Sequence, residues 1–238
     1  MASSSAKRFA PLRESLRASP SDLPVLKGVV FDMDGTLCEP QTYMFTDMRN
    51  ALGITKATDI LEHVESLPAA EQETALEAIR AIERKAMAAQ TPQPGLANLM
   101  SYLDARGVPK AICTRNFDVP VRNLLDNHLA GSVFHPIVTR DFRPPKPDPA
   151  GILHIARHWG LLREGDPDAS GLIMVGDSMD DMTAGRKAGA ATVLLANDVN
   201  RELLDHHHTD LVIQSLDELV DILEEGFRGR EIVVRSST

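Results

Sequence analysis

Few cysteines, no long apolar run and a negative net charge exclude several classes of protein. The 238 residues include only two cysteines, Cys38 and Cys113, so the chain offers neither a disulfide framework nor the paired cysteines of a zinc site. No apolar run approaches the length that spans a bilayer, so we expect no membrane-spanning segment. The net charge of −9 at pH 7 disfavours non-specific binding to nucleic acid. With 43% hydrophobic and 25% charged residues, the rest of the composition is that of an ordinary globular protein.

Apolar runs alternate with amphipathic segments along most of the chain. The first run, LKGVVFD at residues 26–32, is nearly all apolar, as expected of a strand that is buried on both faces. Further strands are expected at 108–114, 134–139, 171–177, 191–196 and 210–215. Helical spacing of apolar residues is found at 94–106, 118–129, 147–160, 180–189 and 216–225. Strands that alternate with helices in this way predict an α/β protein, with a parallel sheet and helices on both of its faces.

A long interval without strand-like sequence follows the first predicted strand. Residues 69–90 have a strongly helical composition, and they are bracketed by Pro68 and by TPQPG at 91–95. Shorter helices are expected at 43–52 and near 58–65. Such an interval is far longer than a normal connection between elements. We therefore interpret 38–93 as a small helical insert at the catalytic edge of the sheet.

The two ends of the chain differ from its centre. Residues 1–27 contain five Lys or Arg and two Asp or Glu, a net charge of +3, so residues 28–238 carry −12. We expect a flexible basic tail over 1–26, a core formed by 27–37 and 94–228, and a C-terminal tail over 229–238. The Ser-, Ala- and Arg-rich start is compatible with a mitochondrial presequence. We expect a cytoplasmic protein, with a mitochondrial location as the alternative.

Polar side chains follow four of the predicted strands. In chain order these are Asp32 and Asp34, Thr114, Lys146, Asp177, and then Asp180 and Asp181. In a parallel sheet, ligands bind beyond the carboxyl ends of the strands. Each of these residues alone is a weak signal, because acids and hydroxyls are common at strand ends and helix caps. Their joint order predicts that one crevice collects them.

The polar residues that follow these strands are of the types that phosphoryl transfer requires. A carboxylate can attack phosphorus in line and form an aspartyl-phosphate, and Mg²⁺ with oxygen ligands would neutralise the repulsion between the two anions. Asp32 and Asp177, with one further acid, form a hard-oxygen site for that ion. Lys146 and the Thr114 hydroxyl would hold phosphoryl oxygens, where charge develops in the transition state. Asp34 is then left for general acid and base catalysis.

Four stretches resemble the ordered motifs of the haloacid dehalogenase superfamily. They are FDMDGTL (31–37), ICTRN (112–116), RPPKPDP (143–149) and VGDSMDDMTAGRKAGA (175–190). The resemblance implies a Rossmann-like doubly wound core with a helical cap inserted after the first motif. Two longer stretches, TYMFTDMRNALGI (42–54) and TRDFRPPKPDP (139–149), are similar to uncharacterised fungal members of the superfamily.

Roles for single residues follow from the same resemblance. It implies that Asp32 is the nucleophile, that Asp34 is the acid/base and a metal ligand through its carbonyl, and that Asp177 is a metal ligand. It also implies that Thr114 and Lys146 bind phosphate. The second acid of the last motif is expected at Asp181, with Asp180 left open as the alternative. Arg115 is a further candidate for phosphate binding, and the candidates for substrate contacts are Asn116, Glu39, Gln41 and Arg143. The flanking residues Arg115, Asn116 and Arg143 could equally anchor loops.

Two features of the sequence exclude several of the reactions that members of the superfamily catalyse. Dehalogenases and phosphonatases lack the second aspartate of the first motif, which this chain has as Asp34. Ion pumps need membrane spans. The resemblance therefore implies a Mg²⁺-dependent phosphatase that acts on a small-molecule phosphate ester, as a monomer or dimer. The alternatives are a sugar phosphomutase and a non-catalytic phosphate-binding protein on the same fold.

The run DHHHTD at 205–210 raises the question of a second metal site. Three consecutive histidines on a helix point in different directions. We therefore expect a solvated helix end there.

Overall fold

The computed structural model describes residues 6–16, 22–162 and 168–231. The chain divides into two compact units. The first consists of Met1–Cys38 and Pro92–Thr238, and the second of Glu39–Thr91. None of the helices in the described ranges is long and apolar enough to cross a membrane.

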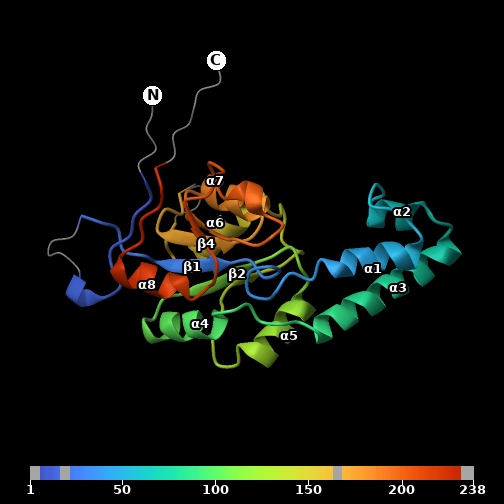
Figure 1. Ribbon diagram of the computed structural model, residues 1–238, viewed down its shortest axis with the longest axis horizontal. Helices are drawn as coiled ribbons and strands as arrows, with labels where there is room; N and C mark the ends of the chain where they lie inside the picture. Colours follow the sequence, from blue (N-terminus) through green and yellow to red (C-terminus); the bar gives the residue numbers. More distant parts are fainter. Residues whose placement is uncertain (1–5, 17–21, 163–167, 232–238) are drawn as a thin grey trace, which may run out of the picture. The chain divides into compact units, whose positions relative to one another are not determined.

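A six-stranded sheet forms the centre of the first unit (Figure 1). The strands are all parallel and lie in the order β3-β2-β1-β4-β5-β6. They are β1 (Gly28–Phe31), β2 (Lys110–Cys113), β3 (Ile137–Val138), β4 (Leu172–Gly176), β5 (Ala191–Leu195) and β6 (Leu211–Ile213). Each strand lies inside one of the six predicted runs. The prediction of a Rossmann-like doubly wound sheet is confirmed, and the strand order changes direction between β1 and β4.

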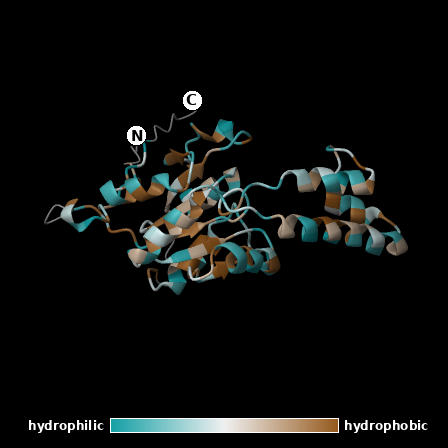
Figure 2. Ribbon diagram, turned by 60° about the horizontal axis from the view of Figure 1, so that its bottom comes forward, coloured by the Kyte–Doolittle hydropathy of each residue, from teal (hydrophilic) through white to brown (hydrophobic). Residues whose placement is uncertain are grey.

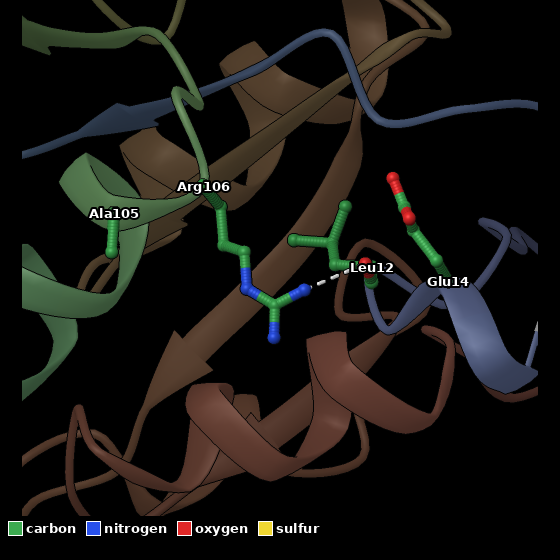
Figure 3. Close-up of a pocket in the computed structure, with 4 residues that line it drawn as sticks. All are labelled: Leu12, Glu14, Ala105 and Arg106. Atoms are coloured by element: carbon green, nitrogen blue, oxygen red, sulfur yellow. Dashed lines mark hydrogen bonds between the residues drawn. The ribbon is translucent and has the colours of Figure 1, made fainter.

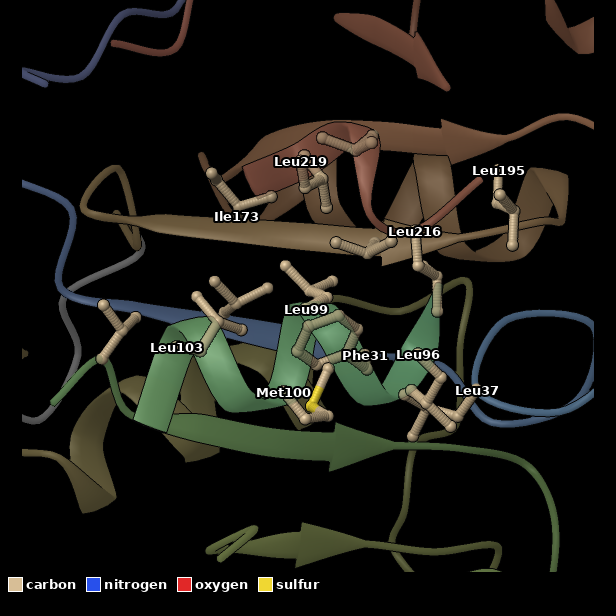
Figure 4. Close-up of a cluster of buried hydrophobic side chains, with 14 of the residues drawn as sticks. Phe31, Leu37, Leu96, Leu99, Met100, Leu103, Ile173, Leu195, Leu216 and Leu219 are labelled. Carbon is tan, nitrogen blue, oxygen red and sulfur yellow. The ribbon is translucent and has the colours of Figure 1, made fainter. Parts of the chain in front are cut away.

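Helices cover both faces of this sheet (Figure 1). They are α4 (Leu96–Ala105), α5 (Asp118–His128) and α8 (Glu218–Glu225) on one face, and α6 (Ala150–His158) and α7 (Met179–Lys187) on the other. Successive side chains of a strand point to opposite faces. Phe31 accordingly belongs to one apolar cluster with Leu99 and Leu103 of α4 (Figure 4). Val30 belongs to another, with Ile152 of α6. Figure 2 shows the strands as mainly hydrophobic and the helices as alternately hydrophobic and hydrophilic, as a sheet buried on both faces requires.

The second unit is helical, with a small apolar cluster of its own. It contains α1 (Tyr43–Leu52), α2 (Ile60–Ser66) and α3 (Ala69–Ala88). Its buried apolar residues are Met48, Val64, Ala75 and Ile79, and partly buried ones such as Leu76 and Ile82 pack against them. The role of this unit as a cap stays a prediction.

The segment before β1 corrects one expectation. Residues 6–16 do not form a free tail, because Phe9 is only 1% exposed and Leu12 only 7%, and both belong to the core of the first unit. Phe9 N–H donates to the carbonyl of Phe227 (3.0 Å), and Leu12 N–H donates to the carbonyl of Leu223 (2.8 Å). A short 3-10 helix follows at Glu14–Leu16. The apolar side chains of this segment therefore cover one end of α8. The expected flexibility of 1–5 and 17–21 lies outside the described residues.

Polar contacts fix the same segment. Glu224 of α8 accepts hydrogen bonds from Arg13, Arg106 and the Tyr102 hydroxyl. Arg106 Nη1 also donates to the carbonyl of Leu12 (2.8 Å), across a surface pocket of about 400 Å³ (Figure 3). Glu224 and Arg106 thus hold the N-terminal segment to both α4 and α8.

The start of the predicted C-terminal tail is also packed. Gly229 N–H donates to the carbonyl of Lys7, and Arg230 N–H donates to the carbonyl of Asp210, both at 2.8 Å. The expectation of a tail from 229 onward is therefore wrong for these two residues. Residues 232–238 lie outside the described part of the chain.

Candidate active site

Residues that follow neighbouring strands meet at the carboxyl edge of the sheet. Asp32 follows β1, Thr114 follows β2 and Asp177 follows β4. Lys146 lies on the loop between β3 and α6. The β1–β2 and β1–β4 pairings are parallel and in register, so these strands end side by side. Because β1 lies between β2 and β4, Asp32 occupies the middle of the edge.

Lys146 forms the centre of a buried charge cluster. Its Nζ lies 2.6 Å from Asp32 Oδ1 and 2.5 Å from Asp181 Oδ1. Asp32 is 7% exposed, Lys146 6% and Asp181 0%. Burial lowers the pKa of Lys146, but the two carboxylates more than offset burial, and the pKa is raised. Burial raises the pKa of Asp32 well above its usual range, although the attraction of Lys146 opposes it. One ammonium thus faces two carboxylates, and the cluster has an excess of negative charge.

The start of α7 determines which acid joins this cluster. The Ser178 hydroxyl accepts a hydrogen bond from Asp181 N–H (3.3 Å), and Asp181 Oδ2 accepts from Ser178 N–H (3.1 Å), a reciprocal capping box. Asp180 instead pairs with Arg115 at the surface. The structure therefore brings Asp181, and not Asp180, next to Lys146.

Asp177 is held by two asparagines from the loop after β5. Asn197 Nδ2 donates to Asp177 Oδ2 (3.2 Å), and Asn200 Nδ2 donates to the Asp177 carbonyl (2.8 Å). Burial and the nearby charge of Asp181 raise the pKa of Asp177 to about 7. Sequence reasoning missed Asn197 and Asn200, because asparagine in a loop is ordinary turn chemistry and carries no signal of its own.

The carboxylates fit a hard divalent cation. Asp32, Asp177 and Asp181 each present one oxygen, and these three atoms all lie within 4.8 Å of one another. Oxygen ligands and excess negative charge are what Mg²⁺ prefers in proteins. Burial, and after it the nearby charge of Asp181, raises the pKa of both Asp32 and Asp177, and a bound cation would oppose both effects.

Asp34 lies beside this cluster and keeps a solvent-exposed face. Nearby atoms nevertheless remove enough water from its carboxylate to raise its pKa, and a hydrogen bond from Asn116 Nδ2 to Oδ2 (2.9 Å) opposes that effect. The buried Thr114 hydroxyl accepts from Asn116 N–H (3.0 Å). Asn116 therefore contacts two of the predicted site residues.

The remaining predicted site residues are not part of the cluster around Lys146 in the described structure. Arg115 is engaged by Asp180 and has no recorded contact with the Lys146 cluster among the described residues. Arg143 is exposed on the loop before Lys146. Glu39 and Gln41 belong to the second unit, where Gln41 Nε2 donates to the carbonyl of Ala86 (2.7 Å). Binding of substrate by these four residues stays a prediction.

The three histidines lie in a turn and not on a helix, which corrects the expectation for this run. The preceding 3-10 helix ends at Leu203, and one nitrogen from each ring of His206–His208 lies within 4.8 Å of the others. Arg230 donates to the carbonyl of His206, and Arg186 donates to that of His207. Burial, followed by repulsion from neighbouring histidines and from Arg186, lowers the pKa of His208 to about 4.

Comparisons with known proteins agree with the motifs. The sequence model of haloacid dehalogenase-like hydrolases matches residues 26–189. An uncharacterised hydrolase of Saccharomyces cerevisiae is 44% identical over 205 residues, which cover 84% of this chain and 91% of that protein. Phosphoglycolate phosphatase 1 of Pseudomonas aeruginosa is 33% identical over 144 residues, or 59% of this chain and 49% of that protein.

A solved structure shares the fold. The crystal structure of a predicted phosphoglycolate phosphatase from Haemophilus somnus has a TM-score of 0.67 at 19% identity, covering 83% of this chain and 97% of the other. With the match over residues 26–189 and the yeast relative, the resemblance inferred from the four motifs is confirmed: the chain belongs to the haloacid dehalogenase-like hydrolases.

Proposed function

We propose that this chain is a Mg²⁺-dependent phosphatase that hydrolyses a small phosphate ester through an aspartyl-phosphate on Asp32. The observation that carries the proposal is the geometry around Lys146. Its ammonium orients Asp32 Oδ1 at 2.6 Å inside a cluster whose other carboxylates have oxygens within 4.8 Å. A buried carboxylate that an ion pair orients at the carboxyl edge of the sheet is suited to in-line attack on phosphorus.

The protein's own groups divide the work of the reaction. Asp32 uses a carboxylate oxygen to form the bond to phosphorus. Lys146, which contacts Asp32, and the buried hydroxyl of Thr114 would donate hydrogen bonds to the phosphoryl oxygens, whose charge must be stabilised in the transition state. Asp34 donates a proton to the leaving oxygen as the ester bond breaks. It then accepts a proton from the water that releases phosphate from Asp32.

The cation would be held by Asp32, Asp177 and Asp181, with the carbonyl of Asp34 as a further ligand. When bound, it supplies positive charge that lets an anionic carboxylate and an anionic phosphoryl group approach each other. Similarity to phosphoglycolate phosphatase 1 of Pseudomonas aeruginosa supports a phosphate monoester of a small metabolite as the substrate class.

The decisive experiment replaces the nucleophile. Asp32→Asn should abolish turnover of p-nitrophenyl phosphate in Mg²⁺ while circular dichroism shows an intact fold. Asp180→Asn makes the same change in an acid that is paired with Arg115 outside the cluster, and it should retain most activity. Wild-type-like turnover by Asp32→Asn would refute the assignment. Incubation of the wild type with sugar phosphates separates the alternative, because a phosphomutase would form isomers before free phosphate.

A further inference from the structure

We propose that Asn116 is a positioning residue: it holds the carboxylate of Asp34 in the orientation that proton transfer needs, and it does not bind the substrate. The inference rests on the proposed function, in which Asp34 is the acid and base. It replaces the expectation from sequence that Asn116 contacts the substrate.

The orientation of the Asn116 amide is fixed by its neighbours. Its Oδ1 accepts a hydrogen bond from Phe117 N–H at 2.8 Å. A backbone N–H can only donate, so the oxygen must be on that side and the NH₂ group on the other. The NH₂ group then faces Asp34, where Nδ2 donates to Oδ2 at 2.9 Å.

The backbone of Asn116 is fixed as well. Its N–H donates to the Thr114 hydroxyl at 3.0 Å, and its carbonyl accepts from Arg140 N–H at 2.9 Å. All four polar atoms of Asn116 thus make hydrogen bonds, three of them to the two loops that follow β2 and β3. A side chain anchored in this way is a rigid support for Asp34.

The contact leaves the two carboxylate oxygens of Asp34 in different surroundings. Oδ2 is engaged by Asn116, whereas Oδ1 has only the Cys38 thiol, at 4.0 Å, as a recorded partner among the described residues. The terminal torsion of an aspartate is broad, so without a support the carboxylate rotates readily. We infer that Asn116 selects one rotamer and leaves Oδ1 to exchange the proton with the leaving oxygen and then with water.

The test uses a substitution that keeps the loop. Asn116→Asp is isosteric and retains an acceptor for Phe117 N–H, but it removes the donor to Asp34. For an alkyl phosphate, whose leaving group needs a proton, we expect kcat to fall about 10- to 100-fold, within the range that general acid–base catalysis contributes. We expect KM to change less than about threefold, since the interaction is not with substrate. Asn127→Asp makes the same change on the exposed end of α5 and should leave both constants unaltered.

A second substrate, p-nitrophenyl phosphate, separates protonation of the leaving group from hydrolysis of the aspartyl-phosphate. p-Nitrophenolate leaves without a proton, so Asn116→Asp should retain a rapid burst of nitrophenolate and then slow turnover. A large rise in KM at unchanged kcat would show instead that Asn116 binds substrate and would overturn the proposal. Unchanged kcat and KM on both substrates would show that Asn116 only anchors the loop and would also overturn the proposal.

The inference and the proposed function can fail separately. A wild type without phosphatase activity would count against the function. Independently of activity, a crystal structure of Asn116→Ala should show Asp34 in more than one rotamer. One unchanged rotamer in that structure would overturn the positioning role.

Discussion

Gly35 lies directly against the carboxylate of Asp177: a β-carbon at residue 35 would be 2.1 Å from Asp177 Oδ2. Gly35 also has a φ of +83°, a conformation that residues with a side chain rarely adopt. The turn that carries Asp34 and the acid after β4 can therefore approach each other this closely only with glycine at this position.

We predict that Gly35→Ala lowers kcat/KM at least about 100-fold, because a displacement of about 1 Å at a reacting site has that effect. Gly107→Ala is the matched control, since Gly107 has a φ of +64° but nothing within 4 Å of a new β-carbon. It should lose about 1–2 kcal/mol of unfolding free energy and keep its activity. Urea unfolding and p-nitrophenyl phosphate kinetics on both variants test this. Equal activity of the two would contradict the close-approach argument.

The N-terminal segment supplies a second prediction, on stability. Phe9 is buried in the main core and stacks at a tilt against Phe227, with ring centroids 5.7 Å apart. Phe9→Ala should reduce the free energy of unfolding by about 3–5 kcal/mol, as for other buried aromatic residues. Leu16→Ala removes a side chain that is 47% exposed and should cost less than about 1 kcal/mol. A mild effect of Phe9→Ala in urea titrations would mean that this segment is dispensable.

The sequence was sufficient for the sheet and for most of the site because both depend on short-range patterns. Six apolar runs in alternation with helices determine a parallel sheet, and a parallel sheet brings the residues after its strands to one edge. Asp32, Thr114 and Asp177 do follow β1, β2 and β4, as this reasoning predicts, and their roles stay predictions. The choice between Asp180 and Asp181 needed the structure, because it depends on the capping box with Ser178.

Other features depend on tertiary contacts that no local pattern records. The basic composition of the N-terminal segment predicts a tail, yet Phe9 and Leu12 pack on α8. Asn197 reaches Asp177 from twenty residues away. The sequence predicts a helix end at the histidine run, but the chain turns after Leu203 and brings the rings together. For Phe9, Leu12 and Asn197 the deciding partner is distant in sequence.

Removal of the central ammonium should destabilise the fold in a pH-dependent manner. Lys146→Met leaves Asp32 and Asp181 buried without compensation, which we expect to cost about 3–5 kcal/mol at pH 7.5. Asp32, whose pKa is already raised by burial, loses its attraction to Lys146 and becomes easier to protonate. The variant should therefore recover stability as the pH falls toward 5.5.

Two controls accompany this variant. Lys187→Met, at an exposed position of α7, should change stability by less than about 1 kcal/mol. The double variant Lys146→Met with Asp32→Asn should regain part of the loss, since one unpaired charge is gone. If the loss of unfolding free energy in Lys146→Met stays constant between pH 5.5 and 7.5, the uncompensated carboxylates of Asp32 and Asp181 are not its cause.

The elevated pKa of Asp177 predicts opposite effects of pH and of Mg²⁺ on stability. Without metal, its pKa is about 7 in the folded chain, against roughly 3.9 when unfolded. Between these two pKa values the folded state binds more protons than the unfolded state. The stabilisation that protonated Asp177 provides is therefore complete below pH 4 and is lost as the pH rises through 7. The slope from one such group is at most about 1.4 kcal/mol per pH unit. Asp177→Asn should flatten the metal-free stability profile between pH 5 and 7.5.

Mg²⁺ should restore the free energy of unfolding that the chain loses when Asp177 ionises. At pH 7.5 the wild type should gain about 2.7 kcal/mol when Mg²⁺ is at 100 times its dissociation constant, and clearly less at pH 5, where protons compete for the same oxygens. Asp177→Asn should show little Mg²⁺-dependent rise in Tm, with NaCl of equal ionic strength as the control. Thermal unfolding over these conditions makes the measurement. An equal rise in the variant would place the ion elsewhere than among Asp32, Asp177 and Asp181.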